Sequence, residues 1–217
     1  MVRQTSSRIK CSFVFMTTVL SKKVLIMAYS QGFFPMPHPE TGEICWFNPD
    51  PRAVIPLDNF HLSRSLRRTI KRGHFKVTID CDFTGVLKGC ASRDETWIND
   101  EIQSIYTEMF VSGLAHSVEV WNDGTLVGGL YGIALGSAFF AESKFHTETD
   151  ASKVALFALV QTLRKIGGKL LEVQFMTRHL ATLGAKEISS EKYLSELALS
   201  LQSSVQYPRG AISLTLP

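Results

Sequence analysis

The region between residues 117 and 175 restricts the fold more than any other part of the chain. Apolar and polar residues alternate there with a period of two, and turn residues separate one alternating stretch from the next. The pattern then changes to the period of an α-helix. The pattern predicts strands over residues 117–121, 125–133, 138–145 and 169–175, with an apolar helix over residues 151–165. Antiparallel hairpins followed by a buried helix and a strand indicate an α+β (mixed α/β) layer fold. The same order of elements occurs in acetyltransferase-like folds, a likeness that by itself says nothing about function.

Prolines mark a boundary earlier in the chain. Six of the eight prolines fall within residues 34–59, a density that excludes a long helix there. A chain of 217 residues has room for one large domain or two small ones. We therefore expect a small N-terminal domain over residues 1–60, Pro-rich at its end, and an acetyltransferase-like domain over residues 61–217.

The first 23 residues carry five cations and no acid around an apolar stretch at residues 11–20. We interpret them as an N-terminal strand or helix with basic ends. The alternative is a targeting segment, but the stretch ends in Ser21-Lys22-Lys23 and not in small residues suited to cleavage. The whole chain contains no apolar run of about 18 residues, which argues against a membrane-spanning helix.

The cysteines indicate a reduced compartment. Cys11, Cys45, Cys81 and Cys90 form no CxxC pair, and no cluster of histidines stands beside them. This spacing argues against zinc and favours a cytoplasmic protein with free thiols.

Residues 62–72 predict a helix with a strongly basic side. Ser63 is placed to cap its N-terminus and Gly73 to end it. The net charge of the whole chain is only +3, yet five cations without an intervening acid gather on this helix face: Arg64, Arg67, Arg68, Lys71 and Arg72. The face is either simply solvated or binds an anionic partner such as the phosphates of a nucleic acid.

Two strands carry acids among apolar residues. In the strand over residues 169–175, period two places Glu172 and Gln174 on one face. In the strand over residues 138–145, the same period places Glu142 and Lys144 together. A carboxylate in such a position needs a partner. Both acids therefore belong either to a functional site or to ion pairs that hold the strands, Glu142 with Lys144 in the second case.

Glycines recur at positions 128, 129, 132 and 136 within a strand pattern. No helix begins after them, so they are not a dinucleotide-binding fingerprint. We expect them to permit β-bulges and the close approach of another backbone or a ligand.

Short blocks spread along the chain carry a family signature. They include Ala28-Tyr29, Pro49-Asp50-Pro51-Arg52, Thr96-Trp97-Ile98, Gly128-Gly129-Leu130-Tyr131-Gly132, Glu142-Ser143, Ala151-Ser152-Lys153 and Gln174. In this order and spacing, residues 19–200 resemble the leucyl/phenylalanyl-tRNA–protein transferases. The resemblance implies transfer of leucine, phenylalanine or methionine from aminoacyl-tRNA to proteins that begin with Arg or Lys. It further implies a cytoplasmic, monomeric enzyme that creates an N-terminal degradation signal and uses no metal or coenzyme.

The resemblance also assigns roles to residues. It makes Gln174, Glu172 and Glu142 catalytic, and Trp97 the aromatic that stacks on the 3′ end of the aminoacyl-tRNA. It places an apolar acyl pocket at five positions: Leu130, Phe139, Lys144, Leu156 and Leu171. Lys71 and Arg72 match the basic patch that holds the tRNA, which agrees with the basic helix face.

Several positions depart from the family pattern, and three of them motivate an alternative function. Met36 stands where a second stacking Trp is typical, Lys144 where the acyl pocket has Met, and Glu172 where the family has Asp. These departures leave open the alternative that the chain is a divergent tRNA-binding paralogue with weak or altered acyl specificity. A coenzyme A-dependent N-acyltransferase is a further alternative, but residues 145–150 contain two acids and no glycine, which would repel a pyrophosphate.

Overall fold

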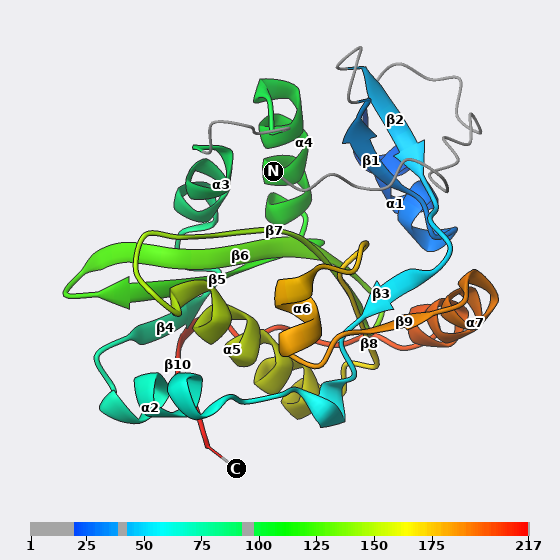
Figure 1. Ribbon diagram of the computed structural model, residues 1–217. Coiled ribbons are helices and arrows are strands. Elements are labelled where there is room, and N and C mark those ends of the chain that lie inside the picture. The colour runs from blue at the N-terminus through cyan, green and yellow to red at the C-terminus, as the bar shows by residue number, and fades with distance from the viewer. Residues whose placement is uncertain (1–19, 39–42, 93–97, 217) are drawn as a thin grey trace.

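An eight-stranded sheet runs through the middle of the protein (Figure 1). The structure is a computed structural model that describes residues 20–38, 43–92 and 98–216. The strand order is β10-β4-β5-β6-β7-β8-β3-β9, antiparallel throughout except between β7 and β8. The strands are β3 Arg52–Val54, β4 Lys76–Ile79, β5 Ala115–Asn122, β6 Thr125–Leu135, β7 Ala138–His146, β8 Leu170–Glu172, β9 Lys186–Ile188 and β10 Gly210–Ile212. The α+β prediction is confirmed.

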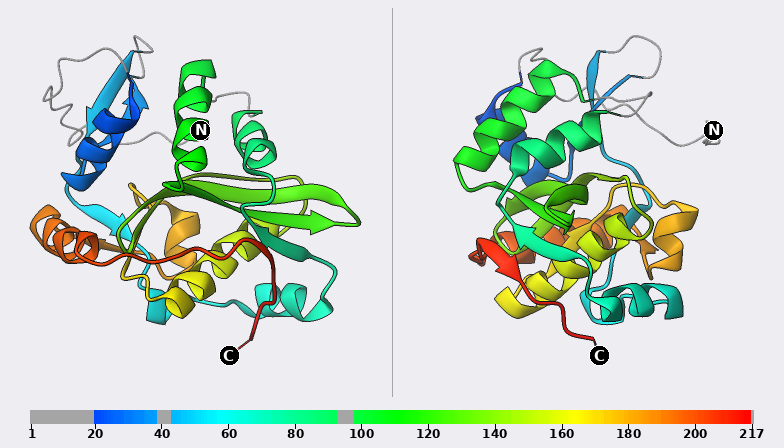
Figure 2. Two further views of the ribbon diagram at one scale, coloured as in Figure 1. Left: turned by 180° about the vertical axis from the view of Figure 1, so that it is seen from behind. Right: turned by 90° about the vertical axis from the view of Figure 1, so that its left-hand side faces the viewer.

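Helices cover both faces of this sheet, as the three orientations in Figures 1 and 2 make clear. They are α1 Lys22–Ser30, η1 Leu57–Asn59, α2 Arg64–Arg72, α3 Phe83–Ala91, α4 Asp100–Val111, α5 Ala151–Ile166, α6 Arg178–Thr182 and α7 Ser190–Leu201. Two apolar clusters result. Helices α1, α3 and α4 pack on one face, and α5 with α2 packs on the other. Each face of the sheet is thus removed from water by its own layer.

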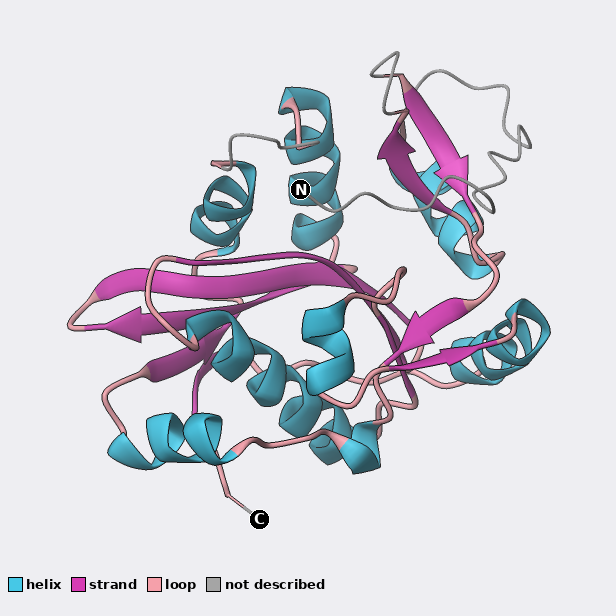
Figure 3. Ribbon diagram, viewed as in Figure 1, coloured by secondary structure: helices cyan, strands magenta, loops and turns pink. Residues whose placement is uncertain are grey.

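A separate two-stranded sheet, β1 Phe34–Pro37 paired with β2 Ile44–Phe47, lies beside α1 (Figure 3). Strand β3 follows directly and already belongs to the large sheet, where it pairs with β8 and β9. The division of the chain at residue 60 stays a prediction.

The predicted hairpins and helix ends agree with the structure to within a few residues. Ser63 caps α2 by accepting a hydrogen bond from the Leu66 N–H at 3.2 Å, and Gly73 ends the helix in the left-handed conformation (φ 69°). Asp150 occupies the N-cap position of α5, but its side chain makes no capping bond and turns to other partners. Helix α1 and strand β10 were not predicted from the sequence.

The prediction of a strand over residues 169–175 is wrong in its second half. Strand β8 ends at Glu172, because Gln174 adopts a left-handed conformation (φ 57°) that a strand cannot contain. The parallel pairing of β7 with β8 stops at the Phe140–Glu172 pair. Among the described residues, β7 and β8 form no further pairs after this one. A pocket lies between the residues that follow in the two strands.

The prediction that Glu142 and Lys144 share a strand face is also wrong. Tyr131 pairs with Ser143 and Gly132 pairs with Ala141, so Glu142 is the extra residue of a β-bulge. A bulge shifts the alternation by one residue. Lys144 therefore pairs with Leu130 on the α5 face, whereas Glu142 contacts tyrosines on the opposite face.

Gly132 is the residue that permits this bulge. A Cβ at position 132 would lie 2.2 Å from the carbonyl oxygen of Phe140 and 2.5 Å from the Phe139 ring. The expectation that glycines in this strand allow a bulge and a close backbone approach is confirmed here.

Candidate functional site

A small pocket of about 120 Å³ opens where β7 and β8 part. Apolar side chains form most of its wall, and Glu142, Lys144 and Gln174 add polar groups. Its lining residues are Leu130, Ala141, Glu142, Ser143, Lys144, Leu156, Val173, Gln174 and Leu180. An apolar hollow with a few convergent polar groups is the usual form of a small-molecule site. We call it the acyl pocket, after the pocket that the family resemblance predicts.

Gln174 is held in the wall of the acyl pocket by three hydrogen bonds. Its N–H donates to Glu172 Oε1 at 2.9 Å, and its carbonyl accepts from the N–H of Ala53 at 3.2 Å. Its Nε2 donates to Glu142 Oε1 at 3.3 Å. A left-handed conformation is unfavourable for a residue with a side chain and persists where its surroundings fix it, as they do here.

Glu142 is half-buried and accepts hydrogen bonds from two tyrosines. Tyr29 of α1 donates to Oε1 at 2.7 Å and Tyr106 of α4 donates to Oε2 at 3.1 Å, while the two hydroxyls lie 2.8 Å apart. Burial raises the pKa of Glu142 to about 8, although the Tyr29 and Tyr106 hydroxyls oppose the shift. The side chain is thus placed to exchange a proton near neutral pH.

Glu172 is fully buried and paired with an equally buried arginine. Arg52 Nη1 donates to Glu172 Oε1 at 2.9 Å, the same oxygen that accepts from Gln174. Burial raises the pKa of Glu172, and Arg52 opposes that shift. Because no part of Glu172 is exposed, it cannot touch a bound molecule in this arrangement. Its observed contacts are those of a residue that positions Gln174.

Arg52 connects Glu172 to two further regions. Its Nη2 donates to the Gly32 carbonyl and, at 2.8 Å, to Asn48 Oδ1. Its guanidinium lies between two rings, with its carbon 5.2 Å from the centre of Phe34 and 4.3 Å from that of Tyr193 in α7.

Arg52, Tyr29 and Tyr106 received no role from the sequence. One signal was available for Arg52, because an acid inside an apolar strand requires a buried cation. The tyrosines carry no comparable signal, since aromatic residues in helices usually serve the core.

The residues expected to form the acyl pocket separate into two groups. Leu130, Lys144 and Leu156 line it, as do Glu142 and Gln174. Phe139 and Leu171 do not, because both are buried in the apolar cluster under α5. Trp97, expected to stack on the RNA end, lies outside the described residues.

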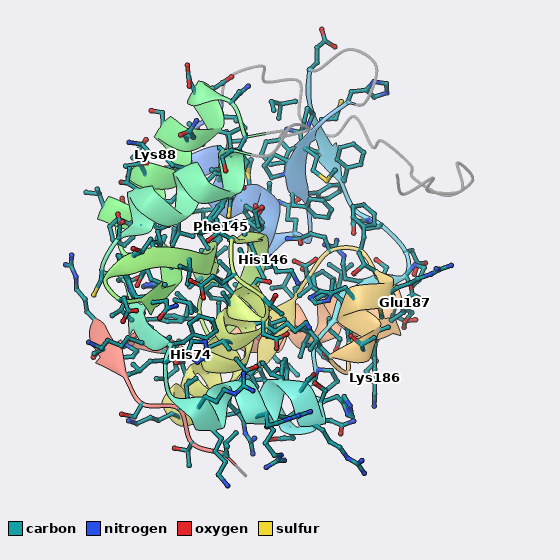
Figure 4. All side chains as sticks on the ribbon, turned by 60° about the vertical axis from the view of Figure 1, so that its left-hand side comes forward. His74, Lys88, Phe145, His146, Lys186 and Glu187 are labelled. Atoms are coloured by element: carbon teal, nitrogen blue, oxygen red, sulfur yellow. The ribbon has the colours of Figure 1, made fainter. Side chains whose placement is uncertain are left out.

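The basic helix face lies on the α5 side of the sheet. All five of its cations are exposed, whereas Leu66 is buried beneath them. Figure 4 shows nitrogen-tipped side chains extending from α2 at the lower edge of the molecule. Thr69, within the same helix, donates to Asp150 Oδ2 at 3.0 Å and so joins α2 to the loop before α5.

Within the described ranges, no group of three or more His, Cys, Asp or Glu side chains could hold a metal ion. No helix in that part of the chain is both long and apolar enough to cross a membrane.

The family models and the curated relatives identify the same family. The model of the leucyl/phenylalanyl-tRNA protein transferase family matches residues 54–198, and that of its N-terminal domain matches residues 19–50. Among solved structures, the L-PGS of Bacillus licheniformis is 11% identical with a TM-score of 0.39, over 89% of this chain and 65% of that one. That likeness is too distant to carry an argument.

Curated relatives are far more similar. A protein of Herpetosiphon aurantiacus named leucyl/phenylalanyl-tRNA–protein transferase is 51% identical over 88% of this chain and all of its own. Proteins of the same name from Ruegeria pomeroyi and Paramagnetospirillum magneticum are 49% and 47% identical, over 89% and 88% of this chain and 96% and 94% of theirs. The family matched by the sequence blocks, by both models and by these relatives is the same, and the chain belongs to the leucyl/phenylalanyl-tRNA–protein transferase family.

Proposed function

We propose that this protein transfers an amino acid from aminoacyl-tRNA to the N-terminal amine of a protein. The observation that carries the proposal is the acyl pocket, with Gln174 held in its wall beside a half-buried Glu142. Family membership supports the same reaction. The finer assignments are leucine, phenylalanine or methionine as the acyl group and an N-terminal Arg or Lys as the acceptor, in a monomeric, cytoplasmic enzyme with an acetyltransferase-like main domain.

The reaction demands little beyond positioning and proton transfer. The acceptor amine attacks the ester carbonyl, a C–N bond forms, and the C–O bond to the ribose of the terminal adenosine breaks. The proton that the amine loses has to reach the departing ribose oxygen. An ester is already activated, so holding the two reactants together supplies much of the acceleration.

In this proposal Gln174 and Glu142 face the reacting atoms, and Glu172 acts through Gln174. The Gln174 amide can donate to the developing oxyanion and accept from the amine. Glu142, with a pKa of about 8, accepts the amine proton. Glu172 is a positioning residue, because its Oε1 holds the Gln174 N–H and it is itself buried.

The test is transfer of labelled leucine or phenylalanine from charged tRNA to a peptide that begins with Arg, with the N-acetylated peptide as the acceptor control. Gln174→Ala should lower the turnover number at least tenfold. Gln202→Ala, an exposed glutamine after α7, is the matched control and should have no effect. Absence of transfer from every aminoacyl-tRNA tested would refute the proposal.

A further inference from the structure

A second cavity, of about 510 Å³, adjoins the acyl pocket. Lys144 lines both, so they share a wall. The second cavity lies between the end of α3, the β7–α5 loop and α6. Figure 4 looks onto this face, with His146 at its centre, Lys88 of α3 above and His74, which follows α2, below. Nothing in the proposed acyl transfer uses this cavity. We call it the second cavity throughout.

Nitrogen donors and hydroxyls gather around the second cavity. Lys144, His146, Lys153 and His179 supply the nitrogens, and Thr147, Thr149 and Ser152 supply hydroxyls. Six of these seven residues come from the continuous stretch that runs from the end of β7 through the loop into α5, and His179 comes from α6. These side chains face one hollow, and they are of the types that bind phosphate oxygens.

Among the described residues that line the second cavity, Asp150 is the only acid, and both of its carboxylate oxygens already accept hydrogen bonds. Oδ1 accepts from Lys153 Nζ at 2.7 Å and Oδ2 from Thr69 at 3.0 Å. A lysine ammonium has three donors, so Lys153 can bind a second acceptor without leaving Asp150. Asp150 therefore orients Lys153, and its negative charge is offset by that lysine, so it does not prevent an anion from binding in the cavity.

His179 reports the electrostatic potential of the second cavity. Its pKa is lowered to about 4, first by burial and then by the neighbouring Lys144, Lys153 and His146. The potential at this ring is therefore positive. An anion placed beside His179 would reverse the effect of those neighbours and raise its pKa.

The second cavity lies between the acyl pocket and the basic helix face. Lys144 joins it to the first, and the Thr69–Asp150 hydrogen bond joins its rim to α2. A nucleic acid whose terminal ester enters the acyl pocket and whose stem rests on α2 has to pass over this hollow.

We propose that the second cavity binds the phosphodiester that links the terminal adenosine of the donor RNA to the nucleotide before it. The proposal rests on the proposed function and adds a subsite to it. Lys153 is its principal cation, with His146, His179 and the loop hydroxyls as further donors. The chemistry recognised is one phosphate attached to the 5′ oxygen of an adenosine, which a coenzyme A molecule could imitate only in part.

The experiment compares two stable ligands by calorimetry. One is 3′-leucylamino-3′-deoxyadenosine, which has no phosphate. The other is the same compound with a methyl phosphodiester on its 5′ oxygen, which adds one negative charge and no base. The wild-type protein should bind the second ligand about tenfold more tightly, as expected for a charge-assisted hydrogen bond.

Three variants show whether Lys153 provides that gain. Lys153→Gln should lose most of the higher affinity for the phosphodiester ligand, while it binds the phosphate-free ligand as the wild type does. Lys153→Arg should retain it. Lys165→Gln removes the same charge from the exposed far end of α5, about 18 Å along the helix, and should retain it as well.

The outcomes separate this proposal from the enzymatic one. Equal affinity of the wild type for the two ligands would overturn it, as would an equal loss of both affinities in Lys153→Gln. Tight binding of acetyl-coenzyme A that displaces the methyl phosphodiester ligand would assign the cavity to a coenzyme instead. A phosphate-dependent gain in a protein that transfers nothing from charged tRNA would support the subsite and refute only the proposed function. As a further readout, NMR titration should show the pKa of His179 rising when the phosphodiester ligand is bound.

Discussion

Two glutamates in the centre of the molecule have similar chemistry and different surroundings. Glu172 is fully buried against Arg52, whereas Glu142 is half-buried and accepts hydrogen bonds from two tyrosines. Burial raises the pKa of both acids, and the group that opposes the shift is the Arg52 cation at Glu172 but tyrosine hydroxyls at Glu142, so the two acids are suited to different tasks. Glu172 holds the Gln174 N–H, and Glu142, with a pKa of about 8, changes its charge near neutral pH.

The titration of Glu142 leads to a prediction about stability. Its pKa rises from 4.5 in the unfolded chain to about 8 in the folded protein. The folded state therefore binds this proton more tightly, and the stability it contributes is present below pH 4.5 and is lost as the pH rises through 8. Between pH 6 and pH 9, the wild type should lose roughly 3 kcal/mol more than Glu142→Gln, which cannot ionise. Urea unfolding at both pH values measures the difference, and parallel losses would contradict it.

At the scale of elements, the sheet makes room for the acyl pocket in two ways. The bulge in β7 places Glu142 on the tyrosine face and Lys144 on the α5 face, and the early end of β8 opens a gap beside it. Both depend on single residues, Gly132 and Gln174, whose local geometry departs from regular strand. The basic helix is a regular element by contrast, with a capping serine and a terminal glycine.

The basic helix leads to a prediction about RNA binding. Replacing Arg67, Arg68, Lys71 and Arg72 with Gln should weaken tRNA binding and reduce its dependence on salt, because each lost phosphate contact releases one counterion fewer. Binding measured from about 50 to 200 mM salt should show a shallower slope. Replacing the exposed Arg164 and Lys165 at the far end of α5 is the control for lost charge. A slope unchanged by the α2 variant would place the RNA elsewhere.

At the scale of the whole molecule, Arg52 joins regions that the sequence keeps apart. It reaches the Gly32 carbonyl before β1, Glu172 at the end of β8, and the ring of Tyr193 in α7. Tyr29 of α1 likewise reaches Glu142 in β7. Helix α1 and the turn that follows it therefore contribute directly to the geometry of the candidate site.

Arg52 leads to a prediction that separates stability from activity. Arg52→Met leaves Glu172 buried without its cation and should destabilise the fold by about 3–5 kcal/mol. Arg52→Met combined with Glu172→Leu removes both charges and should recover most of that loss. Transfer should stay low in the double variant, because the Gln174 N–H no longer has its acceptor. Recovery of full transfer together with stability would show that the pair serves packing alone.

The sequence by itself determined the elements that depend on local chemistry. The hairpins, the apolar helix α5, the capped basic helix α2 and the α+β class follow from periodicity, caps and turn residues, and the ordered blocks determined the family. Two predictions were wrong, namely the strand over residues 169–175 and the shared face of Glu142 and Lys144. Both assumed an unbroken strand, in which side chains alternate with a period of two. Only the tertiary structure placed the bulge, the left-handed Gln174 and the partners of the two glutamates. Those features arise where segments distant in sequence meet, as Arg52 and Glu172 do across 120 residues, and no local pattern records such contacts.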